Sequence, residues 1–144
     1  MTVAAILKDK GRDVVTVTAN HTIAQVCDLL ATHKIGAVVV VEGSDLTVHG
    51  IISERDVVRA VARGGAAALA SSVGDHMTAT VKTCMEADTI EQVAQVMSTG
   101  RFRHMPVTQG GKLVGLISIG DVVKRRIDNA VREAEDMRAY ITAA

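Results

Sequence analysis

The chain contains one pattern of residues twice, and this internal repeat restricts the folds that it can adopt. Residues 22–27 match residues 89–94 at a shift of 67 positions, and residues 50–58 match residues 115–123 at a shift of 65. The two-residue difference falls in one polar, glycine-containing loop, which at residues 42–49 is longer in the first copy than in the second. A repeat of this length indicates two copies of one supersecondary unit that pack on each other.

Hydrophobic periodicity predicts the order strand, helix, strand, strand, helix within each copy. Runs of β-branched residues predict the strands, and apolar residues spaced by three and four predict helices that begin after a Thr or Ser cap. In the first copy, the predicted strands cover residues 14–17, 37–41 and 48–52, and the helices follow Thr22 and Ser53. The second copy runs the same course, with strands over residues 104–107 and 113–117 and helices after Thr89 and Ser118. This alternation predicts an α/β fold.

The repeat also predicts the division of the chain. We expect the first repeat at residues 1–65, the second at residues 66–128 and a C-terminal helix extension at residues 129–144. A unit of about 60 residues buries only about 60% of its unfolded surface, so a single copy is marginally stable and gains from pairing. The connection at residues 64–72 is too short and too apolar to be a free linker, so we expect the halves to pack together.

Composition argues against several classes of function. The 16 basic and 16 acidic side chains cancel, so we expect neither nucleic acid nor anionic lipid as a partner. No apolar run approaches the roughly 18 residues that span a bilayer, and no signal peptide precedes the repeat, so we expect a cytoplasmic protein. Cys27 and Cys84 lack metal-ligand spacing and are expected to be free core thiols. Without a P-loop, a nucleophile and base, or a metal motif, we expect no enzyme and no metal site.

Each copy ends in the motif Gly-x-x-Ser-x-x-Asp, at residues 50–56 and 115–121, and residues 103–107 form an apolar strand before the second. Two such motifs, each preceded by strand, helix and strand in register, resemble a tandem pair of CBS domains, the Bateman module. The resemblance covers nearly the whole chain apart from the final helix. It implies pseudo-twofold repeats packed through their sheets, and two clefts for adenosine-containing ligands such as AMP, ADP, ATP, NAD or S-adenosylmethionine. It also implies a regulatory role in energy or redox sensing, without catalysis.

Two interpretations of Asp56 and Asp121 follow from the sequence. A carboxylate in the first turn of a helix stabilises the helix N-terminus by about 0.3 to 1 kcal/mol, and this alone explains either residue. The family resemblance implies instead that at least one of them accepts the two hydroxyls of a ribose. Ser53 and Ser118 are helix caps that could also donate to a phosphate or sugar.

The resemblance implies clefts built from both halves. The Asp121 cleft, our first choice for occupancy, would combine Thr16, Ile35, Ala37, Arg103, His104, Ser118 and Asp121. The Asp56 cleft would combine Ser53, Arg55, Asp56, Thr83, Phe102 and His104. The resemblance implies that Arg103 and His104 bind a phosphate, whereas without it they are explained as a solvated basic cluster. Arg55 either contacts a phosphate or lies in water. Because their basic residues differ, the two clefts should not bind alike.

The last helix carries an apolar stripe that has no counterpart in the first copy. Val123, Ile127, Val131 and Ile141 lie on it at helical spacing, and such a stripe needs a surface to cover. The stripe either folds back on the module or contributes to a homodimer, and we favour the homodimer. The main functional hypothesis is a ligand-sensing module that acts on an unidentified effector protein, and the alternative is a ligand-free dimerisation and interaction protein.

Overall fold

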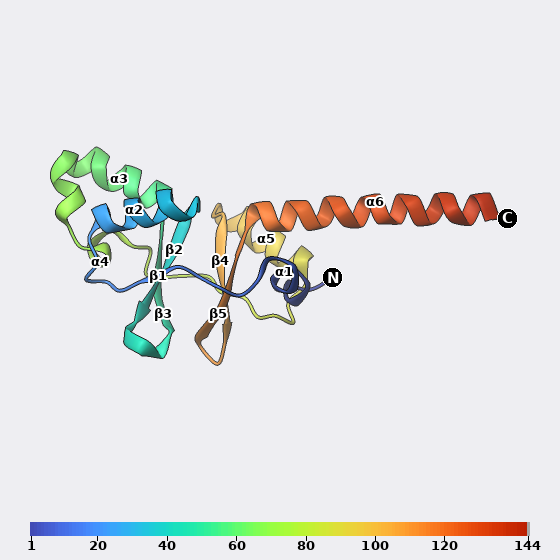
Figure 1. The fold of residues 1–144 in the computed structure, drawn as a ribbon, viewed down its shortest axis with the longest axis horizontal. Helices are drawn as coiled ribbons and strands as arrows, with labels where there is room; N and C mark the ends of the chain where they lie inside the picture. The colour runs from blue at the N-terminus through green and yellow to red at the C-terminus, as the bar shows by residue number, and fades with distance from the viewer. Residues whose placement is uncertain (144) are drawn as a thin grey trace.

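The computed structural model describes residues 1–143 and has the predicted α/β fold (Figure 1). The first half contains α1 (Val3–Lys10), β1 (Thr16–Val17), α2 (Ile23–His33), β2 (Ala37–Glu42), the 3-10 turn η1 (Gly43–Asp45), β3 (Thr47–Ser53) and α3 (Glu54–Gly64). The second half contains η2 (Gly65–Ala70), α4 (Val73–His76), α5 (Ile90–Gly100), β4 (His104–Gln109), β5 (Lys112–Ser118) and α6 (Ile119–Ala143). The four long predicted strands and the four capped helices are therefore confirmed.

Two antiparallel hairpins lie side by side and form one sheet in the order β1-β2-β3-β5-β4 (Figure 1). The hairpins are joined at a single residue pair, Thr47 with Lys112, beside which Lys112 also forms an ion pair with Asp45. Between the hairpins, Val39 and Val41 of β2 form a buried cluster with Leu113 of β5. This shared cluster confirms the prediction that the halves pack through their sheets.

The first strand is much shorter than predicted, and its counterpart in the second half is reduced to one residue. Cys84 forms only an isolated parallel bridge with Val107 of β4. In the first half the N–H of Val39 donates to the carbonyl of Val15 at 3.3 Å. The repeat places Pro106 at the position of Val39, and because proline has no N–H, the matching hydrogen bond cannot form. The parallel ladder therefore ends after one bridge.

The repeated Thr-Ile-x-Gln sequence forms the same helix start in both halves. Thr22 caps α2 and Thr89 caps α5, and each hydroxyl accepts the N–H of the Gln three residues later. Each Gln side chain in turn accepts the N–H of its Thr, at 2.8 Å and 2.9 Å. These two capping boxes fix where both helices begin.

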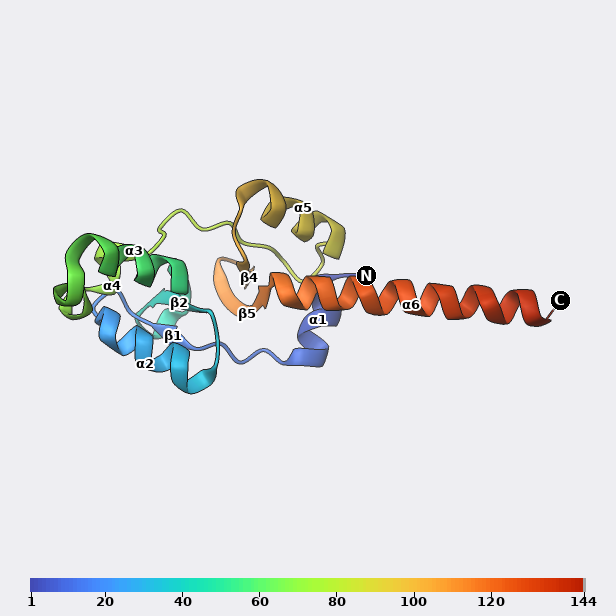
Figure 2. The same cartoon turned by 90° about the horizontal axis from the view of Figure 1, so that it is seen from above.

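Helices α1 and α4 were not predicted, and each packs on the half to which it does not belong in sequence. Thr2, before α1, bridges to Thr89, while Ser72, before α4, bridges to Thr22 in the same way. Leu7 of α1 is fully buried in the core cluster of the second half, and Val73 of α4 is fully buried in that of the first. Figure 2 shows α1 beside the base of α6 and α4 beside α3. The predicted boundary between residues 65 and 66 thus divides the repeat in the sequence, but α1 and α4 each pack on the half that lies on the other side of this boundary.

Helix α6 does not fold back on the module. It runs straight out from the body, well past the end of the second half (Figures 1 and 2). Its apolar side chains are exposed along this length, with 57% of Ile127 and 67% of Ile141 accessible to solvent. In this structure the stripe is therefore exposed and is not packed on its own module, and the homodimer stays a prediction.

Candidate functional site

Asp56 lies in the first turn of α3, where the chain turns from β3 into the helix. Its Oδ2 accepts the backbone N–H of Ser53 at 2.9 Å and the Ser53 hydroxyl at 3.1 Å. The Thr78 hydroxyl lies 3.5 Å from Oδ1. Asp56 therefore stabilises the start of its own helix, as one interpretation of the sequence predicts, and within this network Oδ1 has only the distant Thr78 as a donor.

Asp121 has the same backbone setting at the start of α6 but a different partner. Its Oδ2 accepts the N–H of Ser118 at 2.8 Å, and its own N–H donates to the Ser118 hydroxyl at 3.2 Å. The ammonium of Lys10, at the end of α1, donates to the same Oδ2 at 2.7 Å and to the carbonyl of Leu116 at 2.9 Å. The sequence does not point to Lys10, because this residue reaches Asp121 only through the packing of α1 on the second half.

The protonation of Asp121 follows from these contacts. Burial raises the pKa of Asp121, but the hydrogen bonds from Lys10 and Ser118 and the charge of Lys10 outweigh burial, so the pKa lies below its usual value. Asp121 is therefore an anion that Lys10 already neutralises.

His104, at the start of β4, lies where the two halves meet. A Cβ on Gly36 would come within 3.2 Å of the His104 ring and 2.9 Å of Glu54 Oε1, so Gly36 leaves room for both groups. Burial lowers the pKa of His104, and the charges of Lys10 and Arg103 lower it further, against opposing effects of Glu54 and Asp121. His104 is therefore neutral at pH 7 and would serve a ligand as a hydrogen-bonding group. Sequence analysis missed Glu54, which occupies a variable position of the repeated motif.

The other residues of the predicted clefts make no hydrogen bond to Asp56 or Asp121 within the described part of the chain. The Arg55 guanidinium crosses to the second half and donates to the carbonyl of Arg101 at 3.3 Å. Arg103 is exposed, as expected for a residue that alternates with the half-buried His104, and Phe102 packs against the core of the second half. Thr83 is exposed in the segment before the Cys84 bridge.

The predicted adenine wall is partly closed in this structure. Thr16 is half-buried on β1, and Ile35 is half-buried against the core of the first half. Only 1% of Ala37 is exposed, so its side chain is not presented to a ligand in this conformation. The structure therefore gathers Lys10, His104, Ser118 and Asp121 in one region, and Ser53, Asp56 and Thr78 in another.

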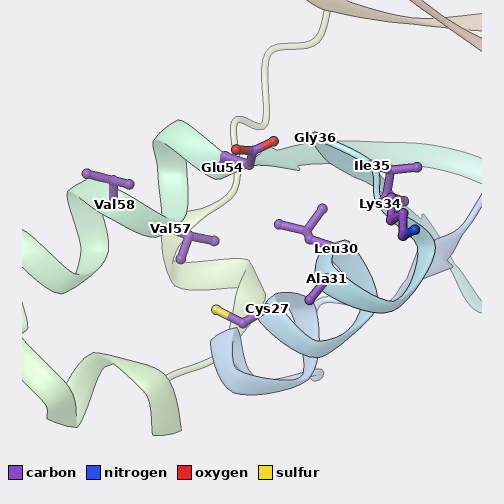
Figure 3. Close-up of a pocket in the computed structure, with 9 residues that line it drawn as sticks. All are labelled: Cys27, Leu30, Ala31, Lys34, Ile35, Gly36, Glu54, Val57 and Val58. Atoms are coloured by element: carbon purple, nitrogen blue, oxygen red, sulfur yellow. The ribbon is translucent and has the colours of Figure 1, made fainter.

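Two hollows lie near these groups. A groove of about 530 Å³ runs between α2 and α3 (Figure 3) and is lined by Cys27, Leu30, Ala31, Lys34, Ile35, Gly36, Glu54, Val57 and Val58. A cavity of about 140 Å³ beside Asp121 is lined by Ile6, Asp9, Lys10, Asp121, Lys124, Arg125 and Asp128. The first is largely apolar and holds one predicted cleft residue, Ile35, whereas the second is charged and holds the Lys10–Asp121 ion pair.

Residues 1–143 contain no cluster of three His, Cys, Asp or Glu side chains suited to hold a metal ion. Within the same residues no helix combines the length and the apolar character needed to cross a membrane. Cys27 and Cys84 are free thiols that pack against different core clusters, Cys27 half-buried and Cys84 buried.

The comparison with protein-family models identifies the repeat. The model of the CBS domain matches twice, over residues 6–63 and 73–128. The chain belongs to the CBS domain family. The CBS domain-containing protein CBSX3, mitochondrial, of Arabidopsis thaliana is 31% identical over 147 residues, which cover 97% of this chain and 71% of that protein.

Solved structures of CBS proteins have the same fold. A CBS-domain protein from Agrobacterium tumefaciens, ATU1752, is 50% identical with a TM-score of 0.83, covering 87% of this chain and 92% of that one. The CBS pair of MJ0100, solved with 5′-methylthioadenosine and S-adenosyl-L-methionine, is 23% identical with a TM-score of 0.80, covering 90% of this chain and 98% of that one. CBSX2, solved with AMP, is 22% identical with a TM-score of 0.73, over 90% of this chain and 98% of that one. The last two are similar to this chain in fold alone.

Proposed function

We propose that the chain is a regulatory module that binds an adenosine-containing ligand such as AMP, ATP or NAD and performs no catalysis of its own. The observation that carries the proposal is the pair of carboxylates, each held at a helix start by the N–H of a Ser. A carboxylate fixed in this way can accept the two hydroxyls of a ribose through charge-assisted hydrogen bonds, which are roughly twice as strong as neutral ones. The ribose-binding role of Asp56 and Asp121 is thus the centre of the proposal.

The groups for a phosphate are drawn from both halves. Arg103 is exposed and reaches solvent freely beside the neutral, hydrogen-bonding His104. Arg55 is already directed across to the second half by its contact with Arg101. A guanidinium recognises phosphate oxygens in a bidentate manner, so Arg103 and Arg55 are the proposed phosphate ligands of the Asp121 and Asp56 clefts.

Two CBS pairs of the same fold, MJ0100 and CBSX2, were solved with adenosine-containing compounds. These complexes favour an adenosyl ligand for this chain over other small molecules. MJ0100 was solved with two different compounds, which is consistent with unequal clefts in a CBS pair.

Calorimetry and thermal unfolding with adenosine, AMP, ATP, NAD and S-adenosylmethionine test the proposal. A ligand at about 100 times its Kd that binds only the folded chain adds about 2.7 kcal/mol to the free energy of unfolding. We expect Asp56→Ala to abolish binding in the Asp56 cleft and Asp121→Ala to abolish binding in the Asp121 cleft. Asp28→Ala, at an exposed position of α2, should leave binding unchanged. If none of these compounds binds the intact chain, the sensing function is wrong.

We also propose that the chain forms a homodimer. If no ligand binds, dimerisation and interaction with other proteins is the alternative function. Val58 of α3 and Val123 of α6 occupy matching positions in the repeat, and 67% and 47% of them are exposed. Together with the groove between α2 and α3 and the stripe of α6, they present apolar surface on helices of both halves. A second copy of the chain, in the cytoplasm, is the proposed partner at this surface, and an effector protein would respond to the ligand.

Sedimentation tests the homodimer. We expect the intact chain to sediment as a dimer, and Val58→Asp or truncation after Asn129 to shift it toward monomer. Met85→Asp, at an exposed position outside these helices, is the matched control and should leave the mass unchanged. A monomeric mass for the intact chain would refute the dimer.

A further inference from the structure

The two pseudo-equivalent carboxylates receive different donors from pseudo-equivalent segments. Helices α1 and α4 pack in the same way on opposite halves: Leu7 lies against Gly115 of β5, and Met77 lies against Gly50 of β3. The segment that continues from α4 brings the Thr78 hydroxyl to 3.5 Å from Asp56, whereas α1 ends by bringing the Lys10 ammonium to 2.7 Å from Asp121. One cleft therefore has a weak neutral donor and the other a strong cationic one.

The Lys10 contact affects what can bind at Asp121. Oδ2 already accepts two hydrogen bonds, from Lys10 and from the N–H of Ser118, whereas Oδ1 accepts none from the described residues. A ribose that engages both oxygens with its two hydroxyls therefore competes with Lys10 at Oδ2. The pair is partly shielded, with 37% of the Lys10 side chain and 24% of the Asp121 side chain exposed. A neutral ribose that displaces Lys10 supplies no anion itself, because hydroxyls carry no charge. Of the other two carboxylates that line the cavity, Asp9 pairs with Arg125, so Asp128 is the one left to meet the ammonium.

A phosphate on the ligand offsets the loss of the ion pair between Lys10 and Asp121. A ligand that carries a phosphate supplies the ammonium with a new anionic partner when Asp121 turns to the ribose. The cavity beside Asp121 has room for the movement, and it is lined by a second ammonium, Lys124. Arg125 in the same cavity is engaged with Asp9 and the carbonyl of Ala5, so Lys10 and Lys124 are the cations placed to follow the ligand.

We propose that Lys10 is the specificity-determining residue of the Asp121 cleft and makes it select phosphate-bearing adenosine ligands over adenosine itself. The Asp56 cleft, where the segment after α4 brings the neutral Thr78 hydroxyl near Oδ1 and no ammonium to Oδ2, lacks this selection. The inference rests on the proposed function, because it presupposes that Asp121 binds ribose.

The test compares the Kd of adenosine with the Kd of AMP in the full-length chain. Asp56→Ala is introduced first, so that calorimetry reports the Asp121 cleft alone. Lys10→Met then frees the carboxylate, and because a partly exposed charged pair contributes little, we expect adenosine to bind about two- to fivefold more tightly. AMP also gains the freed carboxylate but loses the contact between its phosphate and Lys10, so we expect the ratio of the adenosine Kd to the AMP Kd to fall by about twofold or more.

Two control variants separate specificity from structure. Lys10→Arg keeps the charge and should restore the preference for AMP, while Lys8→Met, at an exposed position of the same helix, should leave both Kd values unchanged. A loss of stability in Lys10→Met would not by itself alter the ratio of the two Kd values. An unchanged ratio in Lys10→Met, with both ligands still bound, refutes the role of Lys10 and leaves the proposed function standing. Absence of binding by either ligand in every variant, including the unmodified chain, refutes the proposed function itself.

Discussion

The contact between Leu7 and Gly115 gives a direct test of how α1 packs on the second half. A Cβ added at Gly115 would lie 2.8 Å from both Cδ atoms of Leu7, closer than real Cβ contacts. Leu7 is fully buried and cannot turn into solvent, so Gly115→Ala overpacks the core at a cost of about 1 to 3 kcal/mol. Leu7→Ala alone leaves a cavity and costs about 3 kcal/mol.

The double variant decides the question. If Leu7 contacts Gly115 as the structure has it, the new methyl of Ala fills part of the space that Leu7 vacates. The combined loss is then about 1 to 2 kcal/mol smaller than the sum of the single losses, a coupling expected only for residues in contact. Urea unfolding of the four proteins measures each free energy. Gly120→Ala, whose Cβ would meet nothing closer than 3.6 Å, is the control and should not destabilise the chain. Losses that add within about 0.5 kcal/mol would refute the packing of α1 on this half.

Three further predictions concern single groups. Burial lowers the pKa of His104, so below about pH 6.5 the unfolded chain binds a proton more readily at this residue than the folded chain does. The contribution of His104 to the free energy of unfolding is therefore full above that pH and is lost as the solution is acidified. His104→Gln should reduce the decline in this free energy that urea unfolding measures from pH 7.5 to 5.5. Burial raises the pKa of Cys84 to about 12, so a thiol reagent should label Cys27 in the groove first, and equal rates at both thiols would contradict this assignment. Thr22→Ala and Thr89→Ala should each cost about 1 kcal/mol in thermal unfolding, and a negligible loss at either would contradict its capping box.

Local patterns in the sequence were sufficient for most of the fold. Thr22 and Thr89 predicted two helix starts correctly because a capping box involves residues only three apart. The hairpin strands were predicted because their β-branched runs are buried on the pleated sheet. Helices α1 and α4 were missed for a different reason. Each begins with a Thr or Ser at the N-cap position followed by Val, but these two pairs are related by a shift of 70, which differs from the shifts of 67 and 65 in the rest of the repeat.

The candidate site could be predicted only where the repeat itself carries it. Asp56 and Asp121 stand in the motif that ends each copy, so the sequence places both at helix starts. Lys10 lies 111 residues from Asp121, and no local pattern connects them. Ala37 is buried in the structure, and its place at a ligand wall stays a prediction, because its burial depends on how β2 packs between its neighbours, which the strand's own sequence does not determine.

Part of the asymmetry between the surroundings of Asp56 and Asp121 arises from side chains that the opposite half supplies. The backbone settings of the two carboxylates are nearly the same, since Asp56 accepts the N–H of Ser53 at 2.9 Å and Asp121 accepts that of Ser118 at 2.8 Å. Under the proposed function, a difference in ligand preference therefore comes from the side chains around the two carboxylates. Arg55 and Arg103 each lack a basic counterpart in the other copy, and Lys10 and Thr78 add a difference in charge that comes from the segments packed on the opposite half. If the proposed function is right, the crossed packing of α1 and α4 allows each half to alter the ligand preference of the other without disturbing the helix start that both copies share.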